Sequence, residues 1–467
     1  MKGVAPTLQF LGGAGTVTGA MYLVRAARGE VLLDCGLFQG LKALRLRNWA
    51  PRVAAPADVA AVVLSHAHID HIGYLPLLVK QGFRGPVYCT AATGDLVRVL
   101  LPDCAHLQEE EAERANRWGY SKHHPALPLY SVADAHAALA LLQHRSYGER
   151  FDVGRGITAR LRPAGHILGA ASVDLEVEGT RVVYSGDLGR WNRPLVPDPE
   201  LIAAADVLLL ESTYGERRHP EGGDEQLARV VAETARRGGA LLIPAFAVDR
   251  TQEVVWMLER LEREGRIPAL PVYLDSPLAI EATEIYARHG AYRMPERYRF
   301  ARTPAESQAL NDLTGPFIII SASGMATGGR ILHHLALRLP DERTTVLLVG
   351  FQGAGTRGRL LEEGAREVKM LGRLVPVRAR IEKIDALSAH ADRDDIVRWL
   401  EGFERPPRVT YLVHGEPAAA SALAMAIRDR FGWNVQVARD RETVALQCAA
   451  VDGCRAARSA RRLSPAN

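Results

Sequence analysis

The chain has few cysteines and no long apolar run, and both shortages exclude classes of protein. Its five cysteines are scattered, and none forms a Cys-x-x-Cys pair, so a disulfide framework is not expected and the thiols should be reduced. No apolar stretch approaches the roughly 20 residues that a membrane-spanning helix needs. The first residues also lack the apolar segment of a signal peptide. These absences predict a cytoplasmic protein with no membrane partner.

Lysine is scarce as well, since six of the 58 basic residues are lysines and the rest are arginines. Arginine can bind a phosphate through two parallel hydrogen bonds, and the formal net charge of +4 is compatible with a polyanionic partner. A GC-rich genome explains the arginine bias equally well. Composition therefore leaves the partner open.

What the chain does contain is a dense cluster of metal-ligand side chains at 65–71, with the sequence Ser-His-Ala-His-Ile-Asp-His. The cluster directly follows the apolar run 59–64, which is typical of a buried strand that ends in a loop. Imidazole and carboxylate groups together suit zinc. In an extended loop His66 and His68 point to the same side, whereas Asp70 and His71 turn toward a second position. The loop therefore predicts half of a two-metal site.

Similar ligand-type residues follow other apolar runs. His166 lies between glycines in Gly-His-Ile-Leu-Gly-Ala, and Asp187 ends Tyr-Ser-Gly-Asp just after a strand-like segment. His414 and Asp34 also stand at predicted strand ends. Each of them alone would be explained as a cap or turn residue. Together with the cluster at 65–71 they match the ligand count of a binuclear site.

The 467 residues are too many for one ordinary core, so we expect two domains. Short apolar runs and turns fill the first part, and segments 96–117 and 132–144 are predicted helices. Sheets covered by helices, an αββα layered fold, follow from this order. Strand and helix then alternate after residue 211, which is typical of a parallel α/β sheet.

Site-like residues return after this second region, which indicates that it is inserted into the first fold. We therefore expect an N-terminal part of the first domain at 1–210 and its C-terminal part at 384–445. The inserted α/β domain would cover 211–383. Residues 446–467 are predicted to form a basic, disordered tail.

The series HxHxDH, GHxxGA, SGD and a late histidine is similar to the metallo-β-lactamase superfamily. Three further segments resemble the acidic motif A, motif B and motif C of the β-CASP nucleases, at 209–215, 387–392 and 413–416. Segments 323–330 and 350–358 also resemble that family. The match extends to about residue 440. It is nearest to the bacterial and archaeal homologues of the endonuclease subunit of the cleavage-and-polyadenylation factor, without the N-terminal extension common in archaeal members.

The resemblance implies an αββα metallo-β-lactamase sandwich with an inserted β-CASP domain and two zinc ions per chain. Carried onto matching positions, it assigns His66, His68 and His166 to one zinc. It assigns Asp70, His71 and His414 to the other, with Asp187 and a hydroxide bridging both. Asp34 would accept an imidazole N–H and fix the tautomer of a ligand.

The resemblance also implies the reaction, which is hydrolysis of single-stranded RNA in RNA processing or decay. The catalytic residues would be Asp70, Glu211 and His390. His390, oriented by Glu211, would protonate the leaving 3′-oxygen, so the products would carry 5′-phosphate and 3′-hydroxyl ends. Phosphates of the RNA would contact a glycine-rich segment at a helix start, namely Ser323, Gly328, Gly329 and Arg330, although structural turns explain these glycines almost as well.

Several alternatives stay open at this point. Histidine at 414 favours RNA, because the DNA-repair branch of the family usually carries valine there. Endonucleolytic cleavage is favoured over 5′-3′ exonucleolytic cleavage, since the C-terminal domain of ribonuclease J-like members is not seen. A thioesterase or lactonase of the same fold is a weaker alternative because of the inserted domain and His390. A non-catalytic scaffold is weaker because every ligand position is occupied. The sequence leaves a homodimer undecided.

Overall fold

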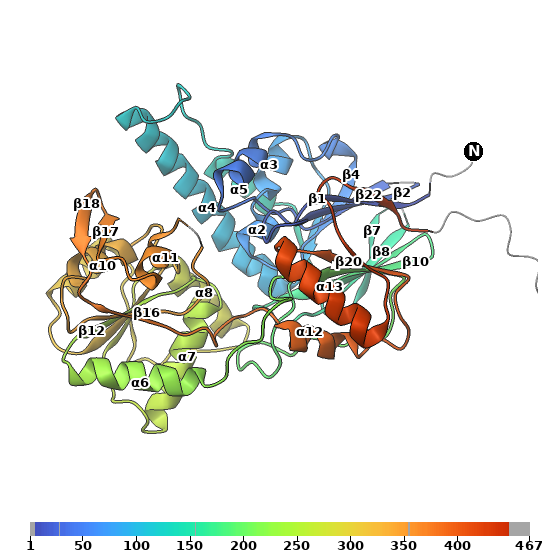
Figure 1. Ribbon diagram of the computed structural model, residues 1–467. Helices are drawn as coiled ribbons and strands as arrows, with labels where there is room; N and C mark the ends of the chain where they lie inside the picture. Colours follow the sequence, from blue (N-terminus) through green and yellow to red (C-terminus); the bar gives the residue numbers. More distant parts are fainter. Residues whose placement is uncertain (1–4, 28, 155, 354, 448–467) are drawn as a thin grey trace, which may run out of the picture.

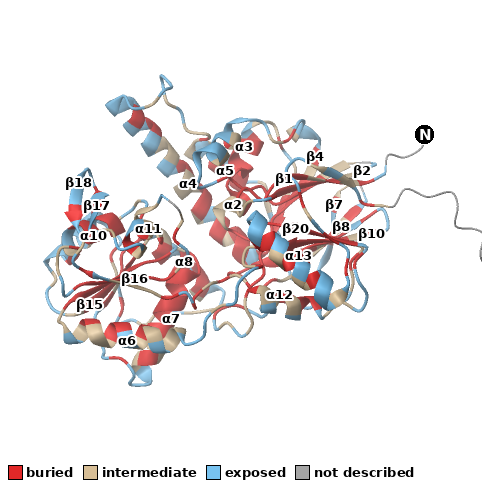
Figure 2. Ribbon diagram, viewed as in Figure 1, coloured by how far each residue is buried: buried red, intermediate tan, exposed pale blue. Residues whose placement is uncertain are grey.

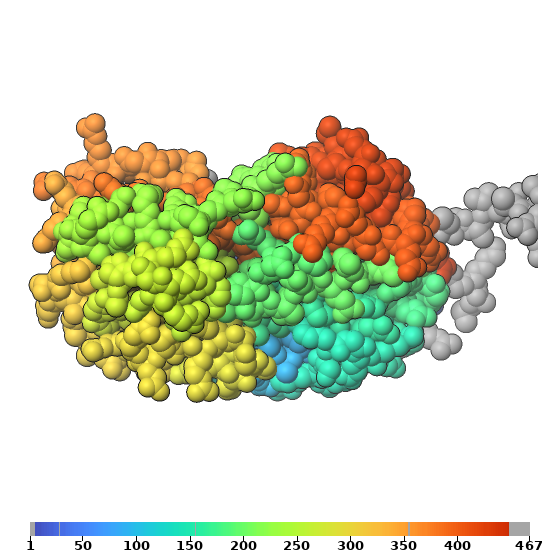
Figure 3. Space-filling view, turned by 90° about the horizontal axis from the view of Figure 1, so that it is seen from below, coloured from blue at the N-terminus to red at the C-terminus, as the bar shows by residue number. Residues whose placement is uncertain are grey.

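The computed structural model describes residues 5–27, 29–154, 156–353 and 355–447. Its helices and strands form two lobes, and both ends of the described chain lie in the right-hand lobe of Figure 1. The left-hand lobe consists of the middle of the chain. Figure 3 shows a waist between the lobes, which is crossed by the green connection from β11 to α6. In the described part of the chain, no helix is long and apolar enough to cross a membrane.

The right-hand lobe contains two seven-stranded sheets that pack face to face. The first has the order β22-β1-β2-β3-β4-β5-β6. Its strands are β1 (Thr7–Gly12), β2 (Met21–Ala26), β3 (Gly29–Leu33), β4 (Val59–Val63), β5 (Val87–Cys89), β6 (Leu142–His144) and β22 (Thr443–Ala445). The second has the order β21-β20-β11-β10-β9-β8-β7. Its strands are β7 (Arg150–Gly154), β8 (Ile157–Pro163), β9 (Ala171–Val177), β10 (Thr180–Tyr184), β11 (Val207–Glu211), β20 (Val409–Val413) and β21 (Val435–Val437).

The central strands of these sheets are buried on both faces, as the red strands of Figure 2 show, whereas the edge strands β6, β7 and β22 carry exposed residues. Successive side chains of a strand point to opposite faces, so Val62 packs under the helices while Val63 packs between the sheets. Strands buried on both faces are expected to be continuously apolar, which explains the uninterrupted run in β4. The helices and 3₁₀ turns of this lobe are α1 (Lys42–Leu46), η1 (Arg47–Trp49), η2 (Pro56–Asp58), α2 (Ile69–Ile72), α3 (Leu75–Lys80), α4 (Ala91–Trp118), α5 (Val132–Leu139), α12 (Arg393–Leu400) and α13 (Pro417–Phe431).

Helices α2 to α5 pack on the outer face of the first sheet, and α12 and α13 pack on the outer face of the second. This order of layers is the predicted αββα sandwich, which is thereby confirmed. The strands that follow the middle lobe complete it: β20 pairs with β11, and β22 pairs with β1 through Thr7 opposite Ala445.

The left-hand lobe is built on a six-stranded sheet with the order β14-β13-β15-β12-β16-β19, in which all neighbouring strands are parallel. Its strands are β12 (Ala240–Pro244), β13 (Val272–Leu274), β14 (Arg299–Phe300), β15 (Phe317–Ser321), β16 (Thr345–Leu348) and β19 (Arg380–Lys383), with the hairpin β17 (Glu367–Met370) and β18 (Arg373–Pro376) beside it. Its helices are α6 (Gly223–Arg236), α7 (Arg250–Arg263), α8 (Pro277–Arg288), α9 (Pro304–Ala309), η3 (Leu310–Asp312), α10 (Ile331–Arg338) and α11 (Arg357–Glu362). Apolar residues of α6, α7 and α8 cover one face, and those of α10 and α11 cover the other.

Two local expectations were wrong. The helix predicted for 132–144 ends at Leu139, because the chain turns at Ala140 and Leu141 and residues 142–144 join the edge of the first sheet as β6. The basic tail was expected to begin at 446, yet Leu446 is fully buried between the sheets and its amide donates to the carbonyl of Pro6. The rest of the predicted tail, 448–467, lies outside the described residues.

Candidate metal centre

The site residues predicted from the sequence follow strand ends that meet at one edge of the sandwich. The parallel strands β10, β11 and β20 are neighbours, and Glu211 is paired with Val413 in the register. Parallel strands end at the same edge of a sheet, so Asp187, Glu211 and His414 come together there. His66 enters from the opposite sheet, at the end of β4.

Three imidazoles form the first group of possible ligands. His68 Nδ1 lies 3.0 Å from His66 Nε2 and 3.2 Å from His166 Nε2. His66 and His166 are fully buried, and His68 is half-buried. Nitrogen atoms this close, from residues 98 positions apart in the chain, converge on one point that a cation could occupy.

A second group lies beside the first and consists of Asp70, His71 and His414. His414 Nε2 lies 3.2 Å from His71 Nε2 and 3.3 Å from Asp70 Oδ2. Asp70 and His71 are in the first turn of α2, which begins directly after His68. The start of this short helix therefore separates the side chains of one loop into two groups.

Asp187 stands between the two groups. Its Oδ2 lies 3.5 Å from His66 Nε2, 3.7 Å from His166 Nε2 and 3.3 Å from His71 Nε2. One carboxylate oxygen is thus within reach of ligand atoms of both groups, which is the geometry required of a bridging ligand.

The electrostatics of the cluster suit a bound cation. Burial holds the pKa of His66 and of His166 well below the ordinary imidazole value, so both rings are neutral, as metal ligands must be. Burial alone would raise the pKa of Asp187, but the imidazoles of His414 and His71 hold it well below its usual range. Nitrogen and carboxylate donors in two adjoining sets fit two zinc ions, and no donor in them is of the wrong chemical type.

Asp34, predicted to support a ligand, is fully buried behind His71. Its Oδ2 lies 2.7 Å from His71 Nδ1, and it also accepts hydrogen bonds from the hydroxyls of Ser65 and Tyr184 at 2.7 and 2.8 Å. A proton on His71 Nδ1 leaves Nε2 free to bind a cation. Asp34 has a φ of +57°, a left-handed conformation that non-glycine residues seldom adopt.

His390 and Glu211 form a pair at the rim of the cluster. His390 Nδ1 lies 3.2 Å from Glu211 Oε2, and the carboxylate is fully buried and accepts the amide of Leu188 at 2.5 Å. Burial alone would lower the pKa of His390, but the charge of Glu211 raises it to about 8. The imidazole therefore carries a proton at neutral pH, next to Asp187, whose Oδ2 is 3.9 Å away.

Three residues near the cluster were not foreseen. Thr213 Oγ1 lies 3.2 Å from His414 Nδ1, and His219 Nε2 lies 2.9 Å from the carbonyl of His390. The buried guanidinium of Arg193 donates to the carbonyl of His166 and to Asp249 Oδ2, the latter at 2.7 Å. Thr213 belongs to the segment that resembles motif A, so that resemblance is a sequence signal for it. A single arginine or histidine in a loop gives no such signal.

The four residues predicted to contact RNA phosphates lie between β15 and α10 in the left-hand lobe. Helix α10 begins at Ile331, so Gly328 and Gly329 lie directly before its first turn. The Arg330 guanidinium donates to Asp275 Oδ1 and to the Ala301 carbonyl, both at 2.8 Å. Arg330 therefore holds parts of the lobe together, and the geometry does not present it as a free phosphate ligand.

The fold and the cluster define an αββα protein with an inserted α/β domain and a two-part, His- and Asp-rich metal centre. Known protein families match the same regions. The Beta-lactamase superfamily domain matches residues 30–242, the Beta-Casp domain matches 251–361, and the Zn-dependent metallo-hydrolase RNA specificity domain matches 374–438.

Individual proteins are similar over almost the whole chain. "Ribonuclease TTHA0252" of Thermus thermophilus is 37% identical over 93% of this chain and 98% of its own length. An "RNase J-like protein" of Methanocaldococcus jannaschii is 32% identical over 90% of this chain and 95% of its own length. "Transcription termination factor FttA" of the same organism is 30% identical over 91% of this chain and 69% of its own length.

A solved structure, a protein of unknown function from Enterococcus faecalis V583, covers 94% of this chain and 100% of its own at a TM-score of 0.55 and 15% identity, which supports the fold alone. The chain belongs to the β-CASP family of metallo-β-lactamase ribonucleases. It is a metal-dependent hydrolase that acts on RNA.

Proposed function

We propose that this protein is a two-zinc endoribonuclease that hydrolyses single-stranded RNA in the cytoplasm and leaves 5′-phosphate and 3′-hydroxyl ends. The observation that carries the proposal is the position of Asp187 Oδ2 between two ligand groups, with the His390–Glu211 pair beside it. A two-part metal centre with an adjoining proton donor suits an in-line displacement at phosphorus.

The proposed ligands follow from the geometry. His66, His68 and His166 would hold one zinc, Asp70, His71 and His414 the other, and Asp187 would bridge them. Bound zinc supplies a more acidic water as nucleophile and offsets the negative charge that builds on the phosphate. Asp34 would orient His71, and the carboxylate charge of Asp70 and Asp187 would help to hold the second ion.

His390 completes the proposed mechanism as general acid. Glu211 fixes the imidazole through Nδ1, so the proton on Nε2 can pass to the leaving 3′-oxygen. Proton transfer of this kind contributes about 10²- to 10⁴-fold to a rate. A small-molecule hydrolase would not need a proton donor held at this position by a buried carboxylate.

We also propose that residues 211–383 act as one inserted domain that restricts access to the metal centre, on a hydrolase domain built from 1–210 and 384–445. A single strand is thinner than a duplex, so it would reach a centre at the junction of two lobes more readily. Ser323, Gly328 and Gly329 remain candidates for contacts to phosphate, and Arg330 is left out for the reason given above.

End-labelled single-stranded RNA and DNA of the same sequence test the proposal. We expect internal fragments from RNA with either a 5′-phosphate or a 5′-hydroxyl end. This cleavage should stop when the metal is removed with a chelator. Release of mononucleotides from 5′ ends only would favour the 5′-3′ exonuclease mode, which the similarity to an RNase J-like protein keeps as the second candidate. Equal cleavage of DNA would overturn the RNA assignment.

His390→Ala tests the general acid separately. We expect the rate on ordinary RNA to fall about 10²- to 10⁴-fold. RNA with sulfur in place of the leaving 3′-oxygen needs no proton at that atom, so the variant should cleave it almost as fast as the wild type. An equal loss on both substrates would contradict the role of His390. His333→Ala, a histidine on the distant helix α10, serves as the control.

A further inference from the structure

Two phenylalanines in the left-hand lobe are exposed where burial would be expected. Of the ten phenylalanines in the chain, Phe246 and Phe351 are the exposed ones, at 43% and 53%. Phe246 is the second residue after β12, and Phe351 is the third after β16. These strands are neighbours and parallel, so both rings stand at the edge where the strands end.

This edge is where an open α/β sheet binds ligands. From β12 the chain passes through α7 to β13, which lies two strands away in one direction of the sheet order. From β15 it passes through α10 to β16, which lies two strands away in the other direction. Helices α7 and α10 accordingly cover opposite faces. The crevice outside β12 and β15 is thus a topological switch point, the usual ligand site of such folds. Phe246 lies in the loop on one side of this crevice.

Glycines leave the Phe246 ring uncovered. A Cβ on Gly324 would lie 3.0 Å from Phe246 Cδ2, and a Cβ on Gly350 would lie 3.7 Å from Cε2. A larger residue at either position would cover the ring or collide with it. The absence of side chains keeps an aromatic face open to a flat ligand.

The loops that carry the rings are held in place. Gln352 is 2% exposed, and its Nε2 donates to the carbonyls of Gly324 and Gly350 at 3.1 and 3.0 Å. The carbonyl of Phe246 accepts the Thr251 hydroxyl at 2.7 Å. Two exposed rings on fixed loops lose little conformational freedom when a partner binds.

The same edge is tied to the metal centre at two points. Asp249, three residues after Phe246, binds Arg193, which also binds the carbonyl of His166. On the far side, the chain leaves β19 at Lys383 and reaches His390 seven residues later, where His390 forms a bridge with Gly189. A polymer whose phosphate lies at the metal centre would therefore pass over the edge that carries the two rings.

We propose that Phe246 and Phe351 form a base-stacking platform for the nucleotides that flank the scissile phosphate. The proposal rests on the proposed function, because it takes the occupant to be single-stranded RNA. Phenyl rings stack on any base, so the platform would select unpaired strands without reading sequence. Bases held in a duplex would not expose their faces to it.

The experiment combines variants of the holoenzyme with RNA that lacks single bases. An abasic nucleotide is moved position by position along a single-stranded RNA, and kcat/KM is measured. Kd is measured by fluorescence anisotropy on holoenzyme that also carries His390→Ala, in which cleavage is expected to be slow. For the wild type, an abasic nucleotide at one or two positions next to the cleavage site should lower kcat/KM about tenfold. This is the effect expected from the loss of one stacked base. Phe246→Leu should lower kcat/KM on intact RNA about tenfold. An abasic nucleotide at the position that stacks on Phe246 should cause no further loss in this variant. Phe351→Leu should behave in the same way at another position.

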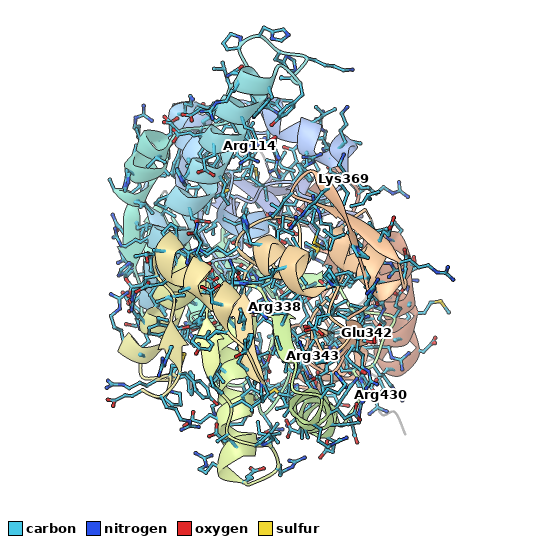
Figure 4. All side chains as sticks on the ribbon, turned by 90° about the vertical axis from the view of Figure 1, so that its left-hand side faces the viewer. Arg114, Arg338, Glu342, Arg343, Lys369 and Arg430 are labelled. Carbon is cyan, nitrogen blue, oxygen red and sulfur yellow. The ribbon has the colours of Figure 1, made fainter. Side chains whose placement is uncertain are left out.

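Phe246→Trp should restore the wild-type values, because an indole also stacks. Trp118→Leu, at the end of α4 and 73% exposed, is the matched control and should change neither quantity. Arg114, one turn earlier on the same helix, is labelled in the upper part of Figure 4. Urea unfolding midpoints equal to that of the wild type would show that the exposed substitutions leave the fold intact.

The proposal would be overturned if the losses in kcat/KM from the leucine variants and from the abasic nucleotides were fully additive. It would also be overturned if the leucine variants bound and cleaved RNA like the wild type. If the wild type bound RNA without cleaving it, the proposed function would fail, while the anisotropy measurements would still decide for or against stacking.

Discussion

At the scale of single residues, Asp34 shows how a buried carboxylate can prepare a metal ligand. It accepts hydrogen bonds from His71, Ser65 and Tyr184, and so links the loop after β4 to the second sheet. The strained left-handed conformation of Asp34 is retained only because these bonds determine its position.

Asp34→Asn should lower zinc affinity about 10- to 100-fold, since an amide cannot favour the required tautomer of His71 as a carboxylate does. Competition with a chromophoric chelator measures the affinity. Asp152→Asn, an exposed aspartate on β7, is the control and should bind zinc like the wild type. Unchanged affinity in Asp34→Asn would mean that His71 is oriented by other contacts.

Asp275, at the end of β13, gives a prediction for pH. Burial alone would raise the pKa of its carboxyl, but hydrogen bonds from His334, Ser307 and Arg330 hold it below its usual range. Its contribution to stability is therefore complete above the ordinary carboxyl pKa of about 3.9 and is lost as the pH falls through the lower, folded value.

Asp275→Asn should have a lower Tm than the wild type at pH 7, and its Tm should fall less between pH 5 and pH 3. Scanning calorimetry across that range compares the two. Asp312→Asn, an exposed aspartate, should follow the wild-type curve. Parallel curves for Asp275→Asn and the wild type would show that this carboxyl does not contribute to acid sensitivity.

At the scale of elements, the connection between the two lobes depends on buried charge. The Arg193 guanidinium lies 2.7 Å from Asp249 Oδ2 and 3.3 Å from Glu253 Oε2, at the start of α7. All three side chains are less than a tenth exposed. Asp249 has a φ of +71°, so α7 begins from a strained residue that this ion pair stabilises.

Arg193→Met should lower the free energy of unfolding by about 3 kcal/mol, because it leaves buried carboxylates without a partner. Urea unfolding measures the change. The double variant Arg193→Met/Asp249→Asn should recover part of the loss, since one unpaired charge is removed as well. If the double variant were less stable than the single one by the full cost of Asp249→Asn, the two side chains would not be coupled.

At the scale of the whole molecule, the metal centre joins segments from both ends of the chain. His66 and His414 are 348 positions apart and belong to different sheets of the sandwich. An ion bound at such a place stabilises the folded protein, because the unfolded chain cannot assemble the site.

Removal of metal with a chelator should therefore lower the Tm, by several degrees if the ions are bound at about 100 times their Kd, which corresponds to roughly 2.7 kcal/mol per site. Differential scanning fluorimetry measures it. The chelator saturated with zinc serves as the control, and zinc added after chelation should restore the Tm. A Tm unaffected by chelation would contradict a metal site that spans the two sheets.

Local patterns in the sequence were sufficient for the family, the layered fold and the residues that gather at the site. Apolar runs predicted the buried strands, and the motif at 65–71 stands directly after one of them. Its ligand-type residues were therefore predicted at a strand end, which is where the structure has them. Weak local signals failed elsewhere: 142–144 joined an edge strand instead of a helix because pairing with β5 satisfies its backbone. Leu446, in a basic segment, was placed in the core by its contact with Pro6.

The sequence by itself determined which chemical groups this protein has available, since imidazoles and carboxylates at strand ends are readable along one dimension. Only the tertiary structure decided further contacts around these groups: that Arg193 ties His166 to the inserted domain, and that Phe246 stands open at a switch point. The physical reason is that these arrangements depend on contacts between segments far apart in the chain. A single arginine or phenylalanine in a loop forms no sequence pattern from which its contacts could be predicted.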